Sequence, residues 1–341
     1  MRSIIGLIAT GITVLVLGAV GAQTASADAV ADFYSGKNVR LMIPSGFGGG
    51  LEGYARAVSR HMRKHIPGKP VIVIISKPGG GGTVGAAFMG NAAPRDGSIF
   101  ALALPASVLQ PVLRKPRFDP RKFNWLGSLL DQPAVVSVWH TSPATTLAGA
   151  KKTQLIMGAT GAGSNTYMIP ALANALIGTK FKVVKGYKGG ARINQAIEQG
   201  EVHGRAAAWG SWPASKGKWL TDNKLRHLFQ IGQKIPSLPN VPSLTDLVKT
   251  EDERQIVSVM GVVSDIGIAF YLPPGVPGAR VAAMRTAFEK TLKDPGLIAD
   301  AKRMIFTIAP VKAHVLQKKI EGVFKLGKPI IAKFKAAMEA K

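Results

Sequence analysis

VRLMIPSGFGGGLEGYAR, residues 39–56, contains an apolar run, a cluster of glycines and a helical repeat in that order. The apolar run ends at Pro44, five glycines follow, and Tyr54, Val58 and Met62 then recur at helical spacing. The pattern predicts a strand, a glycine turn and the start of a helix. Because glycine lets the backbone approach a ligand and a helix start offers free N–H groups, such a turn is suited to hold an anion.

Two further glycine turns follow apolar runs later in the chain. Residues 71–76 lead into PGGGG at 78–82, and residues 154–159 lead into TGAGSNTY at 160–167. Strand-like and helix-like segments alternate throughout, which predicts a mostly parallel sheet covered by helices. Since ligand sites lie beyond the carboxyl ends of such strands, we expect the three turns on one rim. Further strands are predicted at 98–104, 124–130, 134–139, 182–185, 202–209 and 226–231, and a helical tail at 281–341.

The N-terminus has the pattern of a secretory signal peptide. Arg2 precedes an apolar stretch at residues 4–20, and Ala25-Ser26-Ala27 fits a small-residue cleavage site. The stretch is about long enough for a membrane anchor, but its small-residue exit and the lack of a flanking positive stop favour cleavage near Ala27. Residues 1–27 are therefore excluded from fold reasoning, and we expect a periplasmic protein.

Composition narrows the class of partner. The chain has 44 Lys and Arg against 19 Asp and Glu, a formal charge of +25, which attracts anions. That charge also suits nucleic acid or an anionic membrane, but no zinc finger, RNP motif or heptad repeat supports nucleic-acid binding. The chain contains no cysteine, so disulfides, thiolate metal sites and cysteine nucleophiles are excluded. Its length predicts two domains.

Three motifs suggest chemistry but lack the required context. Residues 48–53 satisfy G-x-G-x-x-G, yet Ser76 and Lys77 stand where dinucleotide binding needs an acid. His61 and His65 have metal-ligand spacing, but the basic residues around them favour an exposed basic face. S-x-x-K at 215–218 is predicted to lie in a polar loop, without the apolar helix that such a nucleophile needs. We therefore expect no catalytic residue, no metal and no cofactor.

In this order the glycine turns and their neighbours resemble the substrate-binding proteins of tripartite tricarboxylate transporters, also called the Bug receptor family. The resemblance covers nearly the whole mature chain and rests on six segments: 44–56, 77–102, 158–168, 186–208, 238–247 and 271–295. It implies an α/β type II periplasmic-binding fold, with two α/β lobes joined by two crossing strands and a ligand cleft between them. The implied boundaries are 28–129 plus 235–341 for lobe 1 and 130–234 for lobe 2, with crossings near 129–131 and 232–234.

The resemblance also implies which residues bind the ligand. Two loops, one from each lobe, are expected to clamp a carboxylate through backbone N–H groups and bridging waters. On the first lobe these residues are Ser45, Gly46, Phe47, Gly48, Gly49 and Glu52; on the second they are Gly161, Gly163, Ser164 and Asn165. The glycine turns add Thr83 and Thr160. In the third turn, Ser164, Asn165 and Thr166 either bind a ligand oxygen or cap a helix, and for residues 79–83 the alternative to ligand binding is close backbone packing.

Several residues depart from the family pattern. Glu52 replaces the usual Asp, and Asn165 and Tyr167 replace small, Pro or His residues. Arg205 either grips a second carboxylate or lies on the surface. Trp209 either lines an aromatic-friendly pocket or belongs to the core. These departures leave the ligand open.

The function implied is a periplasmic substrate-binding component of a tripartite tricarboxylate-type transporter, not an enzyme. It would capture a small organic acid, a mono- or dicarboxylate or an aromatic acid, and deliver it as a monomer to inner-membrane permease subunits. The alternatives are an exported hydrolase acting on an anionic substrate, and a sensor-linked binding protein that works without a transporter. No nucleic-acid partner is expected.

Overall fold

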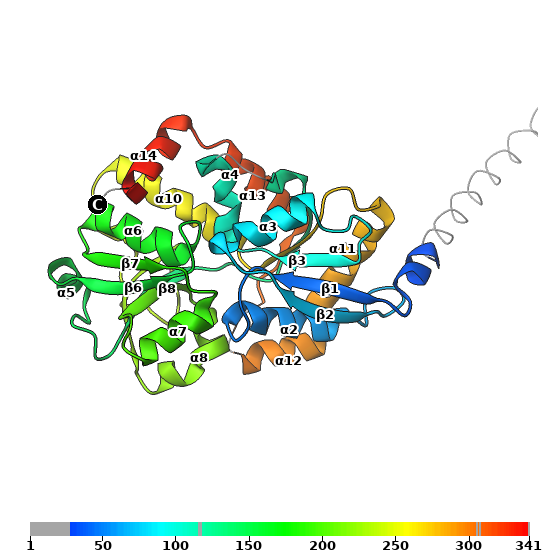
Figure 1. The fold of residues 1–341 in the computed structure, drawn as a ribbon, viewed down its shortest axis with the longest axis horizontal. Helices are drawn as coiled ribbons and strands as arrows, with labels where there is room; N and C mark the ends of the chain where they lie inside the picture. The colour runs from blue at the N-terminus through cyan, green and yellow to red at the C-terminus, as the bar shows by residue number, and fades with distance from the viewer. Residues whose placement is uncertain (1–27, 115–117, 305, 307, 340–341) are drawn as a thin grey trace, which may run out of the picture.

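The computed structural model describes residues 28–114, 118–304, 306 and 308–339, so the predicted signal peptide lies outside the described residues. Two mixed β-sheets lie side by side and helices cover both faces of each (Figure 1). The six-stranded sheet, with its helices, is called lobe 1 here, and the five-stranded sheet lobe 2. The first sheet has the order β11 (Val311–Lys312), β4 (Asn124–Ser128), β10 (Ala269–Leu272), β3 (Ile99–Leu102), β1 (Asn38–Ile43), β2 (Val71–Ser76). The second has the order β7 (Phe181–Lys185), β6 (Leu155–Ala159), β8 (Gly204–Ala208), β5 (Ala134–Trp139), β9 (Leu225–Ile231).

Strand β1 shows how the sequence alternation builds lobe 1. Successive side chains of a strand point to opposite faces. Leu41 therefore joins the core beneath the sheet with Val58 of α2 and Phe288 of α11, while Met42 joins the core on the other face. The helices on the face of Leu41 are α2 (Gly50–Met62), α11 (Gly278–Leu292) and α12 (Pro295–Arg303). On the face of Met42 are α3 (Thr83–Asn91) and α4 (Gln110–Leu113), with 3₁₀ turns at Gly80–Gly82, Pro105–Leu109 and Pro120–Lys122.

In lobe 2, helix α6 lies on one face of the sheet and helices α7 and α8 on the other (Figure 1). The core under α7 and α8 contains Ile193, Trp212 and Trp219, whereas the α6 face joins the core of lobe 1 above the sheets. That shared core also includes helices from the last third of the chain. The bounds are α5 (Leu147–Lys152), α6 (Asn165–Ile177), α7 (Gly190–Glu198), α8 (Ser211–Thr221), α9 (Leu244–Leu247), α10 (Glu251–Ile266), α13 (Ala313–Phe324) and α14 (Lys328–Glu339).

The predicted strands are found with small shifts at their ends, but the prediction of mostly parallel sheets is wrong. β1 pairs in parallel with β2 and β3, and β6 with β7 and β8. β5 and β10 are antiparallel to their neighbours, as is β11 to β4. Because β5 and β10 each follow a passage from one sheet to the other, they do not belong to βαβ crossovers that would force parallel pairing.

The lobe boundaries stay a prediction, but the structure shows which segments connect the sheets. Residues 129–131 lie between β4 and β5, and residues 232–234 follow β9. Leu129 N donates to Ile268 O at 2.8 Å and Gln132 N to Ser264 O at 2.9 Å. The first connection therefore pairs with residues 264–268, which the sequence did not indicate. Helix α14 packs against α6 of lobe 2.

The tail from α13 onward packs by its apolar face. Leu316, Ile320 and Val323 of α13 and Phe334 of α14 are buried, while Val315 is exposed. Among the described residues, no helix combines the length and apolar character needed to span a bilayer.

Candidate functional site

A cavity of about 110 Å³ lies between the two lobes. The walls of the cavity are the turns that follow the strands, the starts of α2, α6 and α7, and the end of β8. Beside it, α2 of lobe 1 packs against α8 of lobe 2, at the lower centre of Figure 1. The lining residues of lobe 1 include Pro44, Ser45, Gly49, Gly50, Tyr54, Pro78, Gly79, Gly81 and Gly82. Those of lobe 2 include Thr160, Ser164, Asn165, Thr166, Tyr187, Lys188, Gly189, Gly190, Arg205 and Ser211. The glycine turns therefore meet at the cavity, but the prediction of one rim is wrong, because the first two follow β1 and β2 of one sheet and the third follows β6 of the other.

The first turn is shaped by Glu52. Its carboxylate accepts a hydrogen bond from Gly48 N, and its Oε1 accepts one from Arg56 Nε at 2.6 Å. The side chain is buried and does not line the cavity. Glu52 thus fixes the turn around the start of α2, and its role in the structure is to hold the loop.

The third turn is braced by its own hydroxyls. Thr160 N donates to Thr166 Oγ1 at 3.0 Å, and Ser164 Oγ donates to Gly161 O at 2.7 Å. Ser164 is the N-cap residue of α6 but makes no side-chain capping bond. Because these hydroxyls are used within the turn, the buried side-chain atom that it leaves without a partner among the described residues is Asn165 Oδ1, an acceptor. The donors at this turn are the free backbone N–H groups at the start of α6.

Backbone contacts close the lobes on either side of the cavity. Gly46 N donates to Lys188 O at 2.7 Å, which joins the first turn to the turn before α7. On the other side, a Cβ at Gly81 would lie 2.7 Å from the carbonyl carbon of Gly163 and from Ser164 N. Gly81 also has a φ of +68°, which L side chains rarely adopt. The facing turns approach so closely because glycine occupies both.

Three buried polar atoms at the cavity lack a partner among the described residues. They are Ser45 Oγ, Tyr54 Oη and Asn165 Oδ1. Burial raises the pKa of the Tyr54 phenol well above its usual range, so the group remains a hydrogen-bond donor. Leaving a buried polar atom unpaired costs about 1–3 kcal/mol. Three such atoms around one cavity indicate that a polar ligand or water completes the site.

The structure divides the residues proposed from sequence into two groups. Those that line the cavity are Ser45, Gly49, Thr160, Ser164, Asn165 and Arg205. Those that do not are Gly46, Phe47, Gly48, Glu52, Thr83, Gly161, Gly163 and Trp209. Phe47 is half-exposed, and Thr83 donates to Gly80 O at 2.9 Å. Trp209 packs edge-on against His227. Their part in ligand binding stays a prediction.

Sequence reasoning missed several lining residues. One missed group is Lys188, Gly189 and Gly190, which lead into α7 at its first residue, Gly190. They show the same strand–glycine–helix pattern that identified the other turns, so a signal was present. Tyr54 was noticed only for its helical spacing, although its hydroxyl reaches the start of α8, where a Cβ on Gly210 would meet it. Gln132, in the first connection between the sheets, gave no local signal.

Two rejected motifs have other environments than expected. The prediction that His61 lies on an exposed basic face is wrong. The residue is buried, and its Nε2 lies 3.0 Å from Asp300 Oδ2. The acids that pair with it come from α12 and the residue before it, far along the chain. The prediction that Ser215 lies in a polar loop is also wrong. The residue lies in α8, and its Oγ donates to Ser211 O at 2.6 Å. No group of three or more metal-binding side chains occurs within the described parts of the chain.

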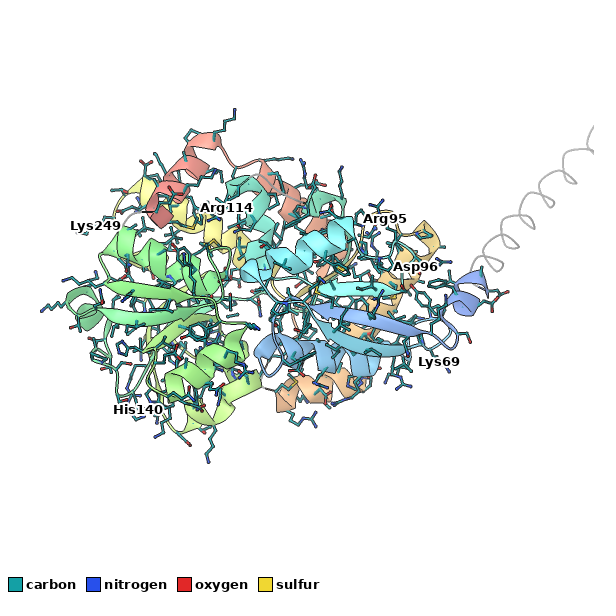
Figure 2. All side chains as sticks on the ribbon, viewed as in Figure 1. Lys69, Arg95, Asp96, Arg114, His140 and Lys249 are labelled. Atoms are coloured by element: carbon teal, nitrogen blue, oxygen red, sulfur yellow. The ribbon has the colours of Figure 1, made fainter. Side chains whose placement is uncertain are left out.

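Cationic side chains surround the whole molecule. Lys69, Arg95 and Lys249 are exposed at separate places on the periphery (Figure 2). None of the described residues that line the cavity is an aspartate or glutamate, whereas Lys188 and Arg205 both line it. The surroundings of the cavity therefore favour an anion.

The comparisons agree with this geometry. Residues 54–335 match the sequence profile of the tripartite tricarboxylate transporter family receptor. No curated protein sequence matches the chain. The chain is similar in structure to the periplasmic binding protein BugD, with a TM-score of 0.72 at 19% identity over 89% of this chain and 98% of that one.

Two further similar structures come from Rhodopseudomonas palustris. Rpa4515 with adipate has a TM-score of 0.69 at 21% identity, over 87% of this chain and 97% of that one. MatC with bound malate has a TM-score of 0.66 at 18% identity, over 89% of this chain and 99% of that one. At these identities the likeness shows the two-lobed periplasmic-binding fold.

Proposed function

The chain belongs to the tripartite tricarboxylate transporter receptor family, and on that premise we propose that it is the periplasmic substrate-binding component of such a transporter. It captures a small organic carboxylate between its two lobes and delivers it to a membrane permease. The pattern of an exported protein in residues 1–27 supports the location. Rpa4515 and MatC, which share the fold, are described with adipate and with malate.

The observation that supports this proposal is the cavity, which has unpaired polar atoms and no acidic lining residue among those described. A carboxylate entering between the lobes meets Ser45 from one side and the start of α6 from the other. Each hydrogen bond to a charged group contributes about 1.5–3 kcal/mol. Because the donors come from both lobes, the ligand stabilises the closed arrangement.

Binding without reaction is favoured over hydrolysis. The Ser–His hydrogen bond closest to a nucleophile–base pair joins Ser137 Oγ and His227 Nδ1 at 2.8 Å. Ser137 is fully buried, and neither residue lines the cavity. Burial and then the nearby Arg226 lower the pKa of His227 to about 4, so the imidazole is neutral at pH 7. A hydrolase would need such a pair facing its substrate.

The expected result of a thermal-shift screen of mono-, di- and tricarboxylates is a raised melting temperature with at least one of them. A ligand at 100 times its dissociation constant adds about 2.7 kcal/mol of stability. Neutral amides of the same acids serve as controls and should give no shift. If no carboxylate changes the melting temperature, carboxylate capture is refuted.

Tyr54→Phe should weaken binding of the best carboxylate about 10-fold without destabilising the empty protein. The removed hydroxyl has no partner among the described residues, so its loss relieves an unpaired donor when the site is empty. Titration calorimetry and urea unfolding measure the two effects separately.

Tyr34→Phe is the matched control. Tyr34 Oη donates to Gly97 O at 3.2 Å, away from the cavity. Its loss should cost about 1 kcal/mol of stability and leave affinity unchanged. Equal affinities for wild type and Tyr54→Phe would contradict a role for Tyr54 in binding.

A further inference from the structure

Arg205 is a buried cation at the wall of the cavity. It lies on β8, between β6 and β5 in the sheet of lobe 2, and it is 5% exposed. Its neighbours along the strand, Ala206 to Ala208, also line the cavity but provide no polar side chain. The alternative that Arg205 is a surface residue is therefore wrong.

Arg205 has no acidic partner within the described part of the chain. Its Nε donates to Asn194 Oδ1 at 2.9 Å, and its guanidinium lies 4.3 Å from the centre of the Trp212 ring. The other guanidinium nitrogens make no hydrogen bond with a described residue. Burial lowers the pKa of Arg205 only to about 10, so the charge persists at pH 7. A buried charge without a counter-ion is costly unless a ligand supplies one.

The groups around the guanidinium are also donors without acceptors. Asn194 Nδ2 and Trp212 Nε1 are buried and have no hydrogen-bond partner within the described part of the chain. The guanidinium lies against the start of α7, since a Cβ on Gly190 would be 3.1 Å from Nη1. The N-terminus of a nine-residue helix adds partial positive charge. The unpaired groups nearest the guanidinium are therefore donors, and none of them supplies it with a negative charge.

We propose that Arg205 binds a second carboxylate, so that the ligand is a short-chain dicarboxylate held at both ends. This inference rests on the proposed function: the turns of Ser45 and Asn165 hold one carboxylate, and the fork of Arg205 holds the other. Asn194 and Trp212 fix the plane of the guanidinium from behind. The cavity of about 110 Å³ limits the chain between the two carboxylates to a few carbons.

The test compares diacids with monoacids of equal chain length by titration calorimetry at constant ionic strength. The probes are succinate, glutarate and adipate against butyrate, pentanoate and hexanoate. In the wild type at least one diacid should bind about 100-fold tighter than its matched monoacid. Arg205→Gln should reduce that ratio to below about 3-fold by weakening the diacid alone, and Arg205→Lys, which keeps the charge but not the fork, should give an intermediate ratio.

Arg192→Gln removes an exposed arginine from α7 and is the matched control for net charge. It should keep the wild-type ratio. A further readout separates binding from support of the fold: the empty Arg205→Gln protein should melt no lower than wild type, because a buried unpaired charge is gone.

The outcomes distinguish the two proposals. If wild type binds monoacids as tightly as diacids, or if Arg205→Gln keeps the diacid preference, the role of Arg205 is overturned while carboxylate capture stands. If wild type binds none of these probes but is stabilised by another carboxylate of the thermal-shift screen, the role of Arg205 is overturned while carboxylate capture stands. If no carboxylate of that screen stabilises it either, both fail. If Arg205→Gln does not fold, Arg205→Lys provides the test. A diacid-to-monoacid affinity ratio equal to that of wild type would overturn recognition by the two guanidinium N–H groups, and a reduced ratio would support it.

Discussion

Gly46→Ala is expected to weaken carboxylate binding at least about 100-fold while leaving the empty protein folded. A Cβ at Gly46 would lie 2.6 Å from Lys188 O, which belongs to the opposite lobe. The same contact contains the 2.7 Å hydrogen bond from Gly46 N. The clash lies where the two lobes meet, so its cost falls on closure and not on the folding of either lobe. Apparent affinity decreases in proportion to the closed fraction.

Titration calorimetry with the best ligand of the screen measures this loss, and urea unfolding checks that the empty protein keeps its stability. Gly261→Ala is the control, because its Cβ would meet nothing within 4 Å and the residue does not line the cavity. It should bind within a few-fold of wild type. Near wild-type affinity in Gly46→Ala would show that binding does not need the approach of the turn to Lys188.

The sequence predicted those parts of the fold that local signals determine. β2 and β5 were placed with their observed bounds because apolar runs end at turn residues. β10 was not predicted, and neither was the antiparallel direction of β5. Pairing of β10 with β3 and β4 joins residues far apart in the chain, which no local pattern encodes.

The candidate site shows the same division. Strand–glycine–helix patterns located Ser45, Thr160 and Asn165 beside the cavity, because backbone geometry at a turn is a local property. The direction of a side chain beside these turns is not such a local property. Glu52 turns toward Gly48 N of its own loop and away from the cavity, and Arg205 is enclosed by α7 and α8. Sequence can propose an acid or a cation for a site, whereas tertiary packing determines whether it faces the ligand.

Asp294→Ala is expected to lower the free energy of unfolding by about 2–3 kcal/mol, since it removes a buried carboxylate that pairs with the half-exposed Lys64 and caps a helix. Asp294 is 4% exposed and precedes α12. Its carboxylate accepts from Lys64 Nζ at 2.7 Å and His65 Nε2 at 2.8 Å, and from Gly296 N at 2.9 Å as the N-cap. Together with Asp300 it attaches α12 to α2, whose first turn forms part of the cavity.

The pH dependence of the free energy of unfolding shows how much of this stabilisation comes from the charge of Asp294. Burial raises the pKa of Asp294, but hydrogen bonds from Lys64, His65 and Gly296 outweigh it and lower the pKa from 3.8 to about 2. Because the folded pKa is below the unfolded one, this stabilisation is complete above pH 3.8 and is lost as pH falls toward 2. It amounts to about 2 kcal/mol. Asp294→Asn keeps an oxygen that can cap α12 but loses the charge. The difference in its free energy of unfolding from wild type should therefore shrink as pH falls from 3.8 toward 2. Asp294→Ala also loses the cap, and that part of its difference from wild type remains at low pH.

Urea unfolding from pH 7 down to pH 3 measures these differences, and Asp252→Ala provides the control. Asp252 is an exposed residue that pairs with Lys333 at 2.6 Å, and such a surface pair contributes below about 1 kcal/mol. A deficit for Asp294→Ala no larger than that of Asp252→Ala would contradict a structural role for the buried pair. An Asp294→Asn deficit that does not change with pH would instead show that the side chain acts through packing and not through its charge.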